Sequence, residues 1–294
     1  MSLTIFSPSG VVDRPPALRL AVRRLTDLGF QVRLDEAVAA RGQRFAGPDE
    51  TRLAALHRVA EQAPSVAMAS RGGYGLSRLL DVIEWPLLAR SVDQGTRWVG
   101  YSDFTALQLG LLAHTKSPSW AGPTAIDAFG GETVDDVTSG CFTEAMNGEL
   151  EALGFRTEAG FDGLEARGVL WGGNLTMVCS VLGTRHFPKV KGGVLFLEDV
   201  NEHPYRVERN LLQLHQAGVL AAQKAVLLGA ITAWKPSRLD RGYKLASAVA
   251  AVRARTPTPI LTGLPFGHVA TQVSLPVGRR VSLAVQGRDA FIGW

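Results

Sequence analysis

The sequence predicts an α/β protein in which an N-terminal, Rossmann-like domain with a parallel sheet precedes a smaller mixed α/β domain. In the first half, short apolar runs alternate with segments of helical periodicity, and Gly/Ser-rich turns follow three of these runs. The pattern weakens around residues 148–166, where glycines interrupt an acidic stretch. The chain has 294 residues, 46% of them hydrophobic, which is enough for two packed units. We therefore expect domains at residues 1–150 and 165–294.

The elements of the first half follow from apolar spacing. Strands are expected at the short apolar runs 3–6, 30–34, 65–69 and 98–99. Helices are expected where apolar residues recur every third or fourth position, at 18–28, 53–59, 76–83 and 107–112. This alternation predicts a parallel sheet covered on both faces, with ligands at the carboxyl ends of its strands. The turns 7–10, 71–75 and 100–103 would lie at that edge.

The second half follows the same logic after residues 148–166, which we interpret as a linker or a strand crossover. Strands are expected at 168–171, 193–197, 225–231, 260–261 and 281–285. Helices are expected at 175–182, 207–216 and 245–252. The second domain therefore mixes strands and helices.

Composition and charge favour a soluble, cytoplasmic protein. The net charge is +4 and arginines are spread along the chain, so nothing indicates a nucleic-acid surface, whereas small acidic substrates would fit. No apolar run is long enough to span a membrane, and the N-terminus lacks a signal-peptide pattern. Cys141 and Cys179 lie far apart in apolar helical segments, which predicts small core residues and no disulfide.

Ser102 is the candidate nucleophile. The apolar run at 98–99 ends in Gly100, Ser102 follows two residues later, and a helical pattern begins at once. A strand, a sharp turn and a helix start are the geometry that a nucleophilic serine needs. Phe104 stands where the common Gly-x-Ser-x-Gly motif has its second glycine. The alternative is that Ser102 or Asp103 only caps the helix.

His268 is the candidate general base. It closes a turn bounded by Pro265 and Gly267, after the strand expected at 260–261, and a rigid strand-end loop is a suitable place for a base. The other histidines lie on predicted helices or in loops without such support: His57, His114, His186, His203 and His215.

Glu198 is the candidate acid that orients the base. Glu198 and Asp199 end the apolar run at 193–197, so they lie at the same kind of sheet edge as Ser102. The alternative is that Asp199 or Asn201 caps the helix that begins near Pro204. Both interpretations hold if Glu198 faces the site and a later residue caps.

The glycine-rich turn at 71–75 is a candidate donor of hydrogen bonds to an oxyanion. Gly72 and Gly73 present backbone N–H groups ahead of a predicted helix, without a Cβ to obstruct them. The turn lacks the spacing of a phosphate-binding loop or of a dinucleotide fingerprint. Arg71 could bind a substrate carboxylate, or form an ordinary ion pair. No metal-binding pattern is present in the sequence.

Together these segments resemble the LD-carboxypeptidases, a family of serine peptidases that includes muramoyltetrapeptide carboxypeptidases and the microcin C self-immunity proteins. The resemblance rests on six segments that occur in order along nearly the whole chain: Ser7-Pro8-Ser9-Gly10, Arg71-Gly72-Gly73-Tyr74-Gly75, Gly100-Tyr101-Ser102-Asp103, Gly172-Gly173-Asn174-Leu175, Leu197-Glu198-Asp199 with Pro204-Tyr205-Arg206, and Leu264-Pro265-Phe266-Gly267-His268.

The resemblance implies a catalytic triad of Ser102 as nucleophile, Glu198 and His268. It places the serine in the N-terminal domain, the other two in the C-terminal domain and the site in the cleft between them. The backbone N–H of Asp103, with one from Gly72 or Gly73, would form the oxyanion hole. No metal or organic cofactor is implied, and many members look like homodimers. The implied activity is removal of the terminal D-alanine from muropeptide tetrapeptides during cytoplasmic peptidoglycan recycling.

Two other functions are weighed against this one. A microcin C-type immunity peptidase would cleave peptidyl or aminoacyl nucleotides and would need an aromatic side chain to stack on the base. Trp171 could serve, although a tryptophan there is by default part of the core or the cleft wall. A non-catalytic muropeptide-binding protein is disfavoured because all three catalytic positions hold competent residues.

Overall fold

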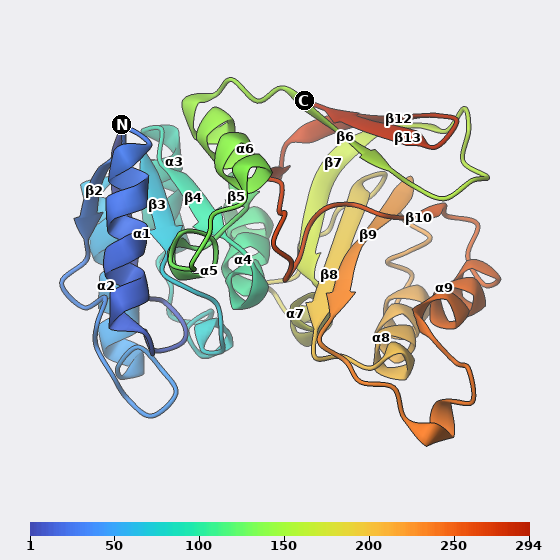
Figure 1. Ribbon diagram of the computed structural model, residues 1–294, viewed down its shortest axis with the longest axis horizontal. Coiled ribbons are helices and arrows are strands. Elements are labelled where there is room, and N and C mark those ends of the chain that lie inside the picture. The colour runs from blue at the N-terminus through green and yellow to red at the C-terminus, as the bar shows by residue number, and fades with distance from the viewer.

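A computed structural model describes all residues from 1 to 294, and it contains two sheets arranged side by side (Figure 1). The first sheet has the strand order β11-β5-β4-β3-β1-β2. Its strands are β1 (Ser2–Phe6), β2 (Gln31–Leu34), β3 (Val66–Ala69), β4 (Arg97–Gly100), β5 (Ser119–Ala121) and β11 (Leu275–Val277). All neighbours are parallel except β11, which pairs antiparallel with β5. Strand order reverses at β1, which lies between β2 and β3, and such a reversal opens a crevice at the carboxyl ends of the strands.

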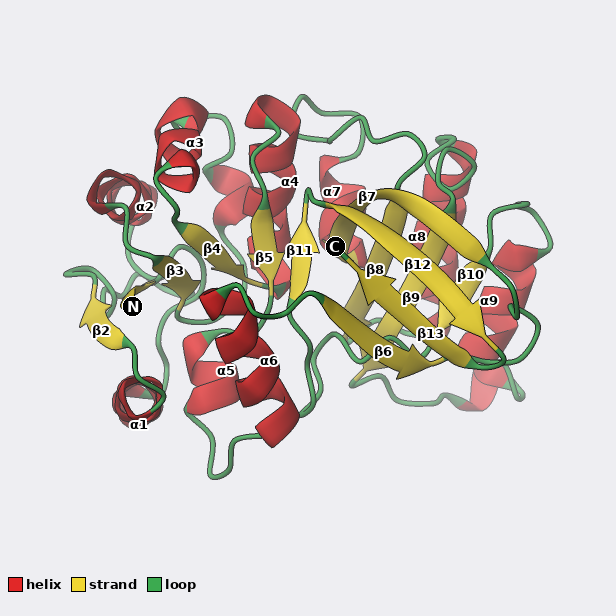
Figure 2. Ribbon diagram, turned by 90° about the horizontal axis from the view of Figure 1, so that it is seen from above, coloured by secondary structure: helices red, strands yellow, loops and turns green.

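Helices cover both faces of the first sheet (Figure 2). One face carries α1 (Pro15–Asp27), α5 (Ala125–Phe129) and α6 (Asp136–Asn147), and the other carries α2 (Asp49–Gln62), α3 (Trp85–Asp93) and α4 (Thr105–Thr115). α1 begins with two prolines in its first turn, where the missing N–H groups cost little. Its buried residues recur at helical spacing and face the sheet: Ala17, Leu18, Ala21 and Leu25.

The second sheet has seven strands in the order β10-β9-β8-β7-β12-β13-β6. They are β6 (Ala152–Arg156), β7 (Glu165–Asn174), β8 (Val194–Val200), β9 (Ala225–Thr232), β10 (Ile260–Thr262), β12 (Arg280–Gln286) and β13 (Asp289–Gly293). The four strands from β10 to β7 are parallel, and the rest are antiparallel. The helices of this half are α7 (Leu175–Val181), α8 (Pro204–Gln216) and α9 (Leu245–Arg253).

A continuous apolar core joins the two sheets. Its buried residues include Trp98 and Leu109 from the first half and Trp171 and Phe196 from the second. The helix α4, which follows the Ser102 turn, contacts both α7 and β7. A second buried cluster lies between the first sheet and α1, α5 and α6. The two halves are therefore packed against each other directly behind the Ser102 turn.

The predicted α/β fold class is confirmed, with a first sheet that is parallel except for β11 and a mixed second sheet. The helix predicted at 76–83 is wrong: a single 3₁₀ turn (Leu76–Arg78) is followed by turns, and α3 begins only at Trp85. Residues 148–166 hold the edge strand β6, so they are more than a linker. Cys141 and Cys179 are free and half-buried. The domain bounds stay a prediction. None of the helices combines the length and the apolar character that a membrane crossing requires.

Candidate active site

Ser102 lies on a strained turn between β4 and α4. Its φ is +64°, in the left-handed region that residues other than glycine rarely adopt. Gly100 precedes the turn, and a Cβ there would approach the ring of Phe104 to 2.7 Å, so the tight path requires a glycine. Ser102 begins a 3₁₀ turn (Ser102–Phe104) that leads directly into α4. Neither this turn nor α4 has a side-chain cap, which rules out the helix-cap interpretation. Such strained turns occur where a nucleophile must be exposed.

The glycine-rich loop packs directly against this turn. A Cβ on Gly72 would lie 2.8 Å from Ser102 Oγ, so only glycine allows this close approach. The buried carboxylate of Asp103 accepts a hydrogen bond from Leu76 N–H at 2.9 Å, which ties the end of the loop to the turn. Burial raises the pKa of Asp103, and the hydrogen bond from Leu76 opposes that shift. The backbone N–H groups of Gly72 and Gly73 donate to no acceptor within the chain. They are therefore free to bind an oxyanion.

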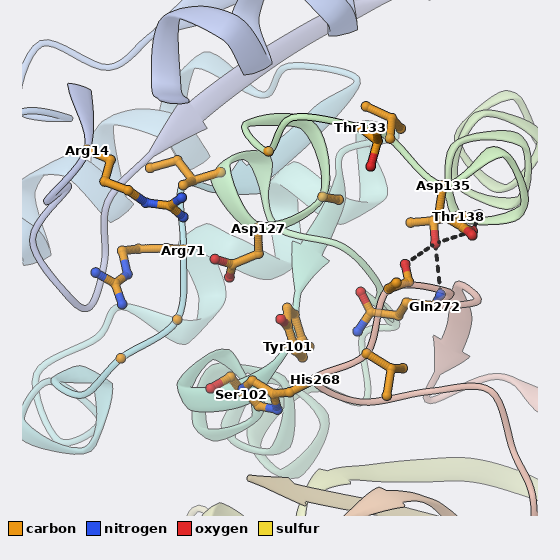
Figure 3. Close-up of a pocket in the computed structure, with 18 of the residues that line it drawn as sticks. Arg14, Arg71, Tyr101, Ser102, Asp127, Thr133, Asp135, Thr138, His268 and Gln272 are labelled. Carbon is orange, nitrogen blue, oxygen red and sulfur yellow. Dashed lines mark hydrogen bonds between the residues drawn. The ribbon is translucent and has the colours of Figure 1, made fainter. Parts of the chain in front are cut away.

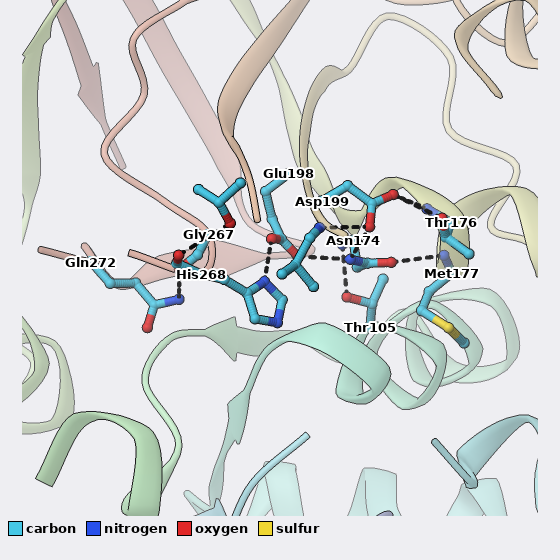
Figure 4. Close-up of polar contacts among 11 residues, drawn as sticks. Thr105, Asn174, Thr176, Met177, Glu198, Asp199, Gly267, His268 and Gln272 are labelled. Atoms are coloured by element: carbon cyan, nitrogen blue, oxygen red, sulfur yellow. Dashed lines mark hydrogen bonds and ion pairs between the residues drawn. The ribbon is translucent and has the colours of Figure 1, made fainter. Parts of the chain in front are cut away.

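His268 and Glu198 form a hydrogen-bonded pair (Figure 4). Glu198 lies near the end of β8 and is fully buried, and its Oε2 accepts from His268 Nδ1–H at 2.8 Å. Burial lowers the pKa of His268, but the hydrogen bond and negative charge of Glu198 outweigh it and leave the pKa above its ordinary value. Because Nδ1 donates to Glu198, Nε2 of the neutral ring is an acceptor, as a general base requires. The ring of Tyr101 packs against the imidazole at 4.8 Å between centroids.

Asn174 orients the carboxylate of Glu198, a role that was not predicted from the sequence. Its Nδ2 donates to Glu198 Oε1 at 3.1 Å and to Asp199 at 2.9 Å. Its Oδ1 caps α7 by accepting from Met177 N–H, and its own N–H donates to Thr105 beside the Ser102 turn (Figure 4). Asn174 belongs to the Gly172-Gly173-Asn174-Leu175 segment, one of the six on which the family resemblance rests, and this segment could have indicated the role.

Asp199 accepts hydrogen bonds from the first turn of α7 and makes none to α8. Its Oδ2 accepts from both N–H and Oγ1 of Thr176, each within 2.9 Å. The cap of α8 is the side chain of His203, so the alternative in which Asp199 or Asn201 caps this helix is wrong, while capping by a later residue holds. Glu198 is thus left to His268, while its neighbour in sequence orders the next helix.

Ser102 and His268 line one cavity of about 790 Å³ (Figure 3). No hydrogen bond joins the two side chains in this structure, whereas the His268–Glu198 bond is already made. Arg71 lines the same cavity, forms an ion pair with Asp13 at 3.1 Å and donates to Val11 O at 3.2 Å. Five of the predicted site residues therefore line this cavity: Arg71, Gly72, Gly73, Ser102 and His268. Glu198 lies behind His268 and is bonded to it.

Trp171 does not belong to the cavity. It is fully buried, and its Nε1–H donates to Gln223 at 3.0 Å. Four of the other histidines have hydrogen-bond partners away from the cavity: His57, His114, His186 and His203. The Nδ1 atom of the fifth, His215, is buried without a partner. No three His, Cys, Asp or Glu side chains are grouped as a metal site would require.

The chain matches both domains of one peptidase family. The LD-carboxypeptidase N-terminal domain matches residues 3–122, and the LD-carboxypeptidase C-terminal domain matches residues 167–283. A murein tetrapeptide carboxypeptidase from Pseudomonas aeruginosa is 30% identical, over 90% of this chain and 88% of the relative. A probable murein peptide carboxypeptidase from Bacillus subtilis is 28% identical, over 98% of this chain and 90% of the relative.

Two solved structures are similar to this chain in fold. The crystal structure of muramoyltetrapeptide carboxypeptidase from Oxalobacter formigenes has a TM-score of 0.92 and 36% identity, and the match covers 99% of this chain and 98% of that one. The microcin C7 self-immunity protein MccF, in complex with aspartyl sulfamoyl adenosine, has a TM-score of 0.88 at 20% identity, over 100% of this chain and 96% of that one, which is a likeness of fold. With both family domains matched in order, the chain belongs to the LD-carboxypeptidase family of serine-type carboxypeptidases.

Proposed function

We propose that this protein hydrolyses the bond before the terminal D-alanine of muropeptide tetrapeptides, as a cytoplasmic homodimer in peptidoglycan recycling. The names of relatives that cover most of the chain support the substrate class. The single observation that carries the chemistry is the His268–Glu198 pair, at 2.8 Å, on the same cavity as a serine at a strained turn.

In the proposed reaction, Ser102 Oγ attacks the carbonyl carbon of the scissile bond while His268 Nε2 takes the hydroxyl proton. Glu198 holds the imidazole in the required tautomer and stabilises the imidazolium. The oxyanion is bound by the N–H of Asp103 and by an N–H of Gly72 or Gly73. His268 then gives its proton to the leaving amine of D-alanine, and a water activated by the same base hydrolyses the acyl-enzyme.

The hydrogen bond between Ser102 and His268 forms, on this proposal, when substrate fills the cavity. Catalytic hydrogen bonds are often long or absent in the free enzyme and tighten in the complex. Arg71 is the proposed partner of the substrate's terminal carboxylate, since a guanidinium matches a carboxylate in a bidentate way. Its ion pair with Asp13 would hold it toward the cavity until substrate arrives.

The microcin-type alternative finds less support in this chain. Trp171, the aromatic side chain considered for stacking on a base, is enclosed in the core and bonded to Gln223. A binding protein without activity is disfavoured because the strain at Ser102 and the buried Glu198 would bring it no benefit.

The test is to incubate the protein and a Ser102→Ala variant with a muropeptide tetrapeptide and with a pentapeptide ending in D-alanyl-D-alanine. We expect D-alanine, detected by mass spectrometry, from the tetrapeptide only, with the rate in the variant reduced on the order of 10⁴-fold or more. Circular dichroism checks that the variant is folded. Release by the variant at the same rate would exclude Ser102 as nucleophile. No release by the wild type would exclude this substrate class and direct the assay to aminoacyl nucleotides.

A further inference from the structure

The cavity holds a carboxylate that the proposed reaction does not use. Asp127, on α5, lines the cavity together with Ser102, and its side chain is exposed there (Figure 3). Its Oδ2 accepts a hydrogen bond from Thr124 Oγ1 at 2.8 Å, which fixes the direction of the carboxylate. No lysine, arginine or histidine nitrogen lies within 4 Å of it, so its charge is unpaired.

Asp127 is close to the reaction centre. Its carboxylate faces the hydroxyl of Tyr101, whose ring packs against His268 at 4.8 Å (Figure 3). Burial raises the pKa of Tyr101 well above its ordinary value, and the charge of Asp127 adds to that shift. One aromatic side chain therefore separates this carboxylate from the proposed base. A long substrate side chain can bridge such a gap.

The cations of the cavity do not neutralise Asp127. Arg71 is held by Asp13 and Val11, and Arg14, on the same cavity, has no ion pair. Most lining residues are polar or charged, so an apolar side chain would find little surface to bury. Asp135, the nearest carboxylate in sequence that lines the cavity, is occupied by Thr138 and Thr271 in capping α6.

We propose that Asp127 determines specificity by binding an ammonium group on the side chain of the residue that precedes the scissile bond. This inference rests on the proposed function. In a carboxypeptidase the terminal residue leaves, so the preceding residue becomes the acyl group on Ser102 and its side chain extends into the cavity. A cationic side chain pairs with the free carboxylate, and a neutral one leaves that charge without a partner.

The test compares two tetrapeptides that differ in one group, with lysine or Nε-acetyl-lysine before the terminal D-alanine. For the wild type we expect acetylation to lower kcat/KM roughly tenfold or more. Asp127→Asn should lower kcat/KM for the lysine peptide by a similar factor and leave the acetylated peptide nearly unchanged, so that the preference is lost. Asp136→Asn is the matched control, because Asp136 is an exposed carboxylate on the same cavity and bonds to no part of the proposed machinery. It should keep the preference.

Two results would overturn the inference: a wild type that does not distinguish the peptides, or an Asp127→Asn variant that still does. If Asp127 only positioned Tyr101 against His268, its variant would lower kcat equally for both peptides and shift the pH profile. Binding of both peptides to Ser102→Ala, followed by calorimetry, makes the same comparison without turnover. Absence of D-alanine release from either peptide would instead count against the proposed function, while equal binding would still overturn this inference.

Discussion

The imidazole of His268 is the single group whose protonation state controls the proposed reaction. Burial lowers its pKa, but the hydrogen bond and the negative charge of Glu198 raise it by more, so the net pKa lies above the ordinary value. A general base must be neutral, and a raised pKa means that protonation begins at a higher pH. We therefore expect kcat/KM to fall with decreasing pH already in the near-neutral range.

Glu198→Gln should separate the electrostatic from the geometric contribution of this residue. Glutamine can still accept from Nδ1–H, but the negative charge is gone, so the pKa of His268 should fall and the acid limb of kcat/KM should move to lower pH. The maximal kcat should drop on the order of 10²- to 10⁴-fold, because the imidazolium loses its counter-charge. The measurement is D-alanine release from pH 5 to 9. An unmoved acid limb would show that another group governs it.

Single residues were predictable where a motif marks them. Ser102 follows a strand, Glu198 lies near the end of one and His268 lies in the loop after one, each in a segment of recognisable composition. The structure brings the three side chains together. Asn174 was not assigned, because an asparagine after a strand looks like an ordinary helix cap, which it also is. Asp127 and the threonine three residues before it have the Ser/Thr-x-x-Asp/Glu spacing of a helix start, which indicates a cap and not a binding residue. The importance of Asp127 arises from the lack of a cation nearby, which only three-dimensional coordinates reveal.

At the scale of elements, the decisive contact is the one between the glycine-rich loop and the Ser102 turn. The two segments are joined by Asp103 and Leu76 at one point and touch at Gly72 and Ser102 at another. Neither segment alone fixes the serine. The loop follows β3 and the turn follows β4, and these strands are parallel neighbours, so sheet pairing sets the contact.

Gly72→Ala tests this contact. The added methyl group would come within 2.8 Å of Ser102 Oγ, and the serine must move. We expect kcat to fall on the order of 10²-fold, because displacement of a nucleophile by about 1 Å has such an effect. The protein should remain folded, since the φ of Gly72 is one that alanine tolerates.

Gly140→Ala is the matched control. Gly140 lies inside α6, has open space where a Cβ would stand and has an ordinary φ. We expect unchanged activity and a free energy of unfolding higher by about 0.5–1 kcal/mol, since alanine is the better helix former. Equal activity of the two variants would contradict the proposed role of the Gly72 contact.

Elements were predictable where they are long and strongly periodic. The helix predicted at 76–83 is wrong although its apolar spacing was interpreted correctly as burial. Successive turns, and not a helix, bring the four apolar side chains into the core: Leu76, Leu79, Leu80 and Ile83. The strands β5 and β11 have three residues each, too few for a detectable alternation. β6 is the edge strand of the second sheet and β13 pairs with it. Each has five residues, of which at most two are buried, so neither gives a detectable alternation.

At the scale of the whole molecule, a chain of polar contacts joins the two halves on the side of α4. His114, at the end of α4, bonds to His186 in the loop after α7 at 2.9 Å, and His186 bonds to Asp81 at 3.0 Å. Burial lowers the pKa of His114, and the positive charges of His186 and Arg185 lower it further. Protonation of His114 therefore opposes this contact.

His114→Asn tests the pH dependence of the contact. A histidine with a lowered folded-state pKa destabilises the fold as pH falls through its unfolded value, because the unfolded chain takes up the proton first. We expect the wild type to exceed the variant in free energy of unfolding by about 1 kcal/mol or less at pH 7.5. The difference should shrink at pH 5.5. Urea unfolding at the two pH values measures this difference in the free energy of unfolding. The pKa of His268 is shifted in the opposite direction, but His268 is present in both proteins, so its contribution cancels. A constant difference would contradict the prediction.

The path of the chain after β10 has a consequence for biosynthesis. The loop that carries His268 leaves the second sheet at β10 and enters the first sheet as β11, which pairs with β5. A nascent chain that has passed Ser102 holds the proposed nucleophile without the proposed base, and the edge of β5 stays open until almost the last residues are made. On the proposed mechanism, hydrolysis therefore begins only with a nearly finished polypeptide, and neither half of a chain cut between the two sheets would be active.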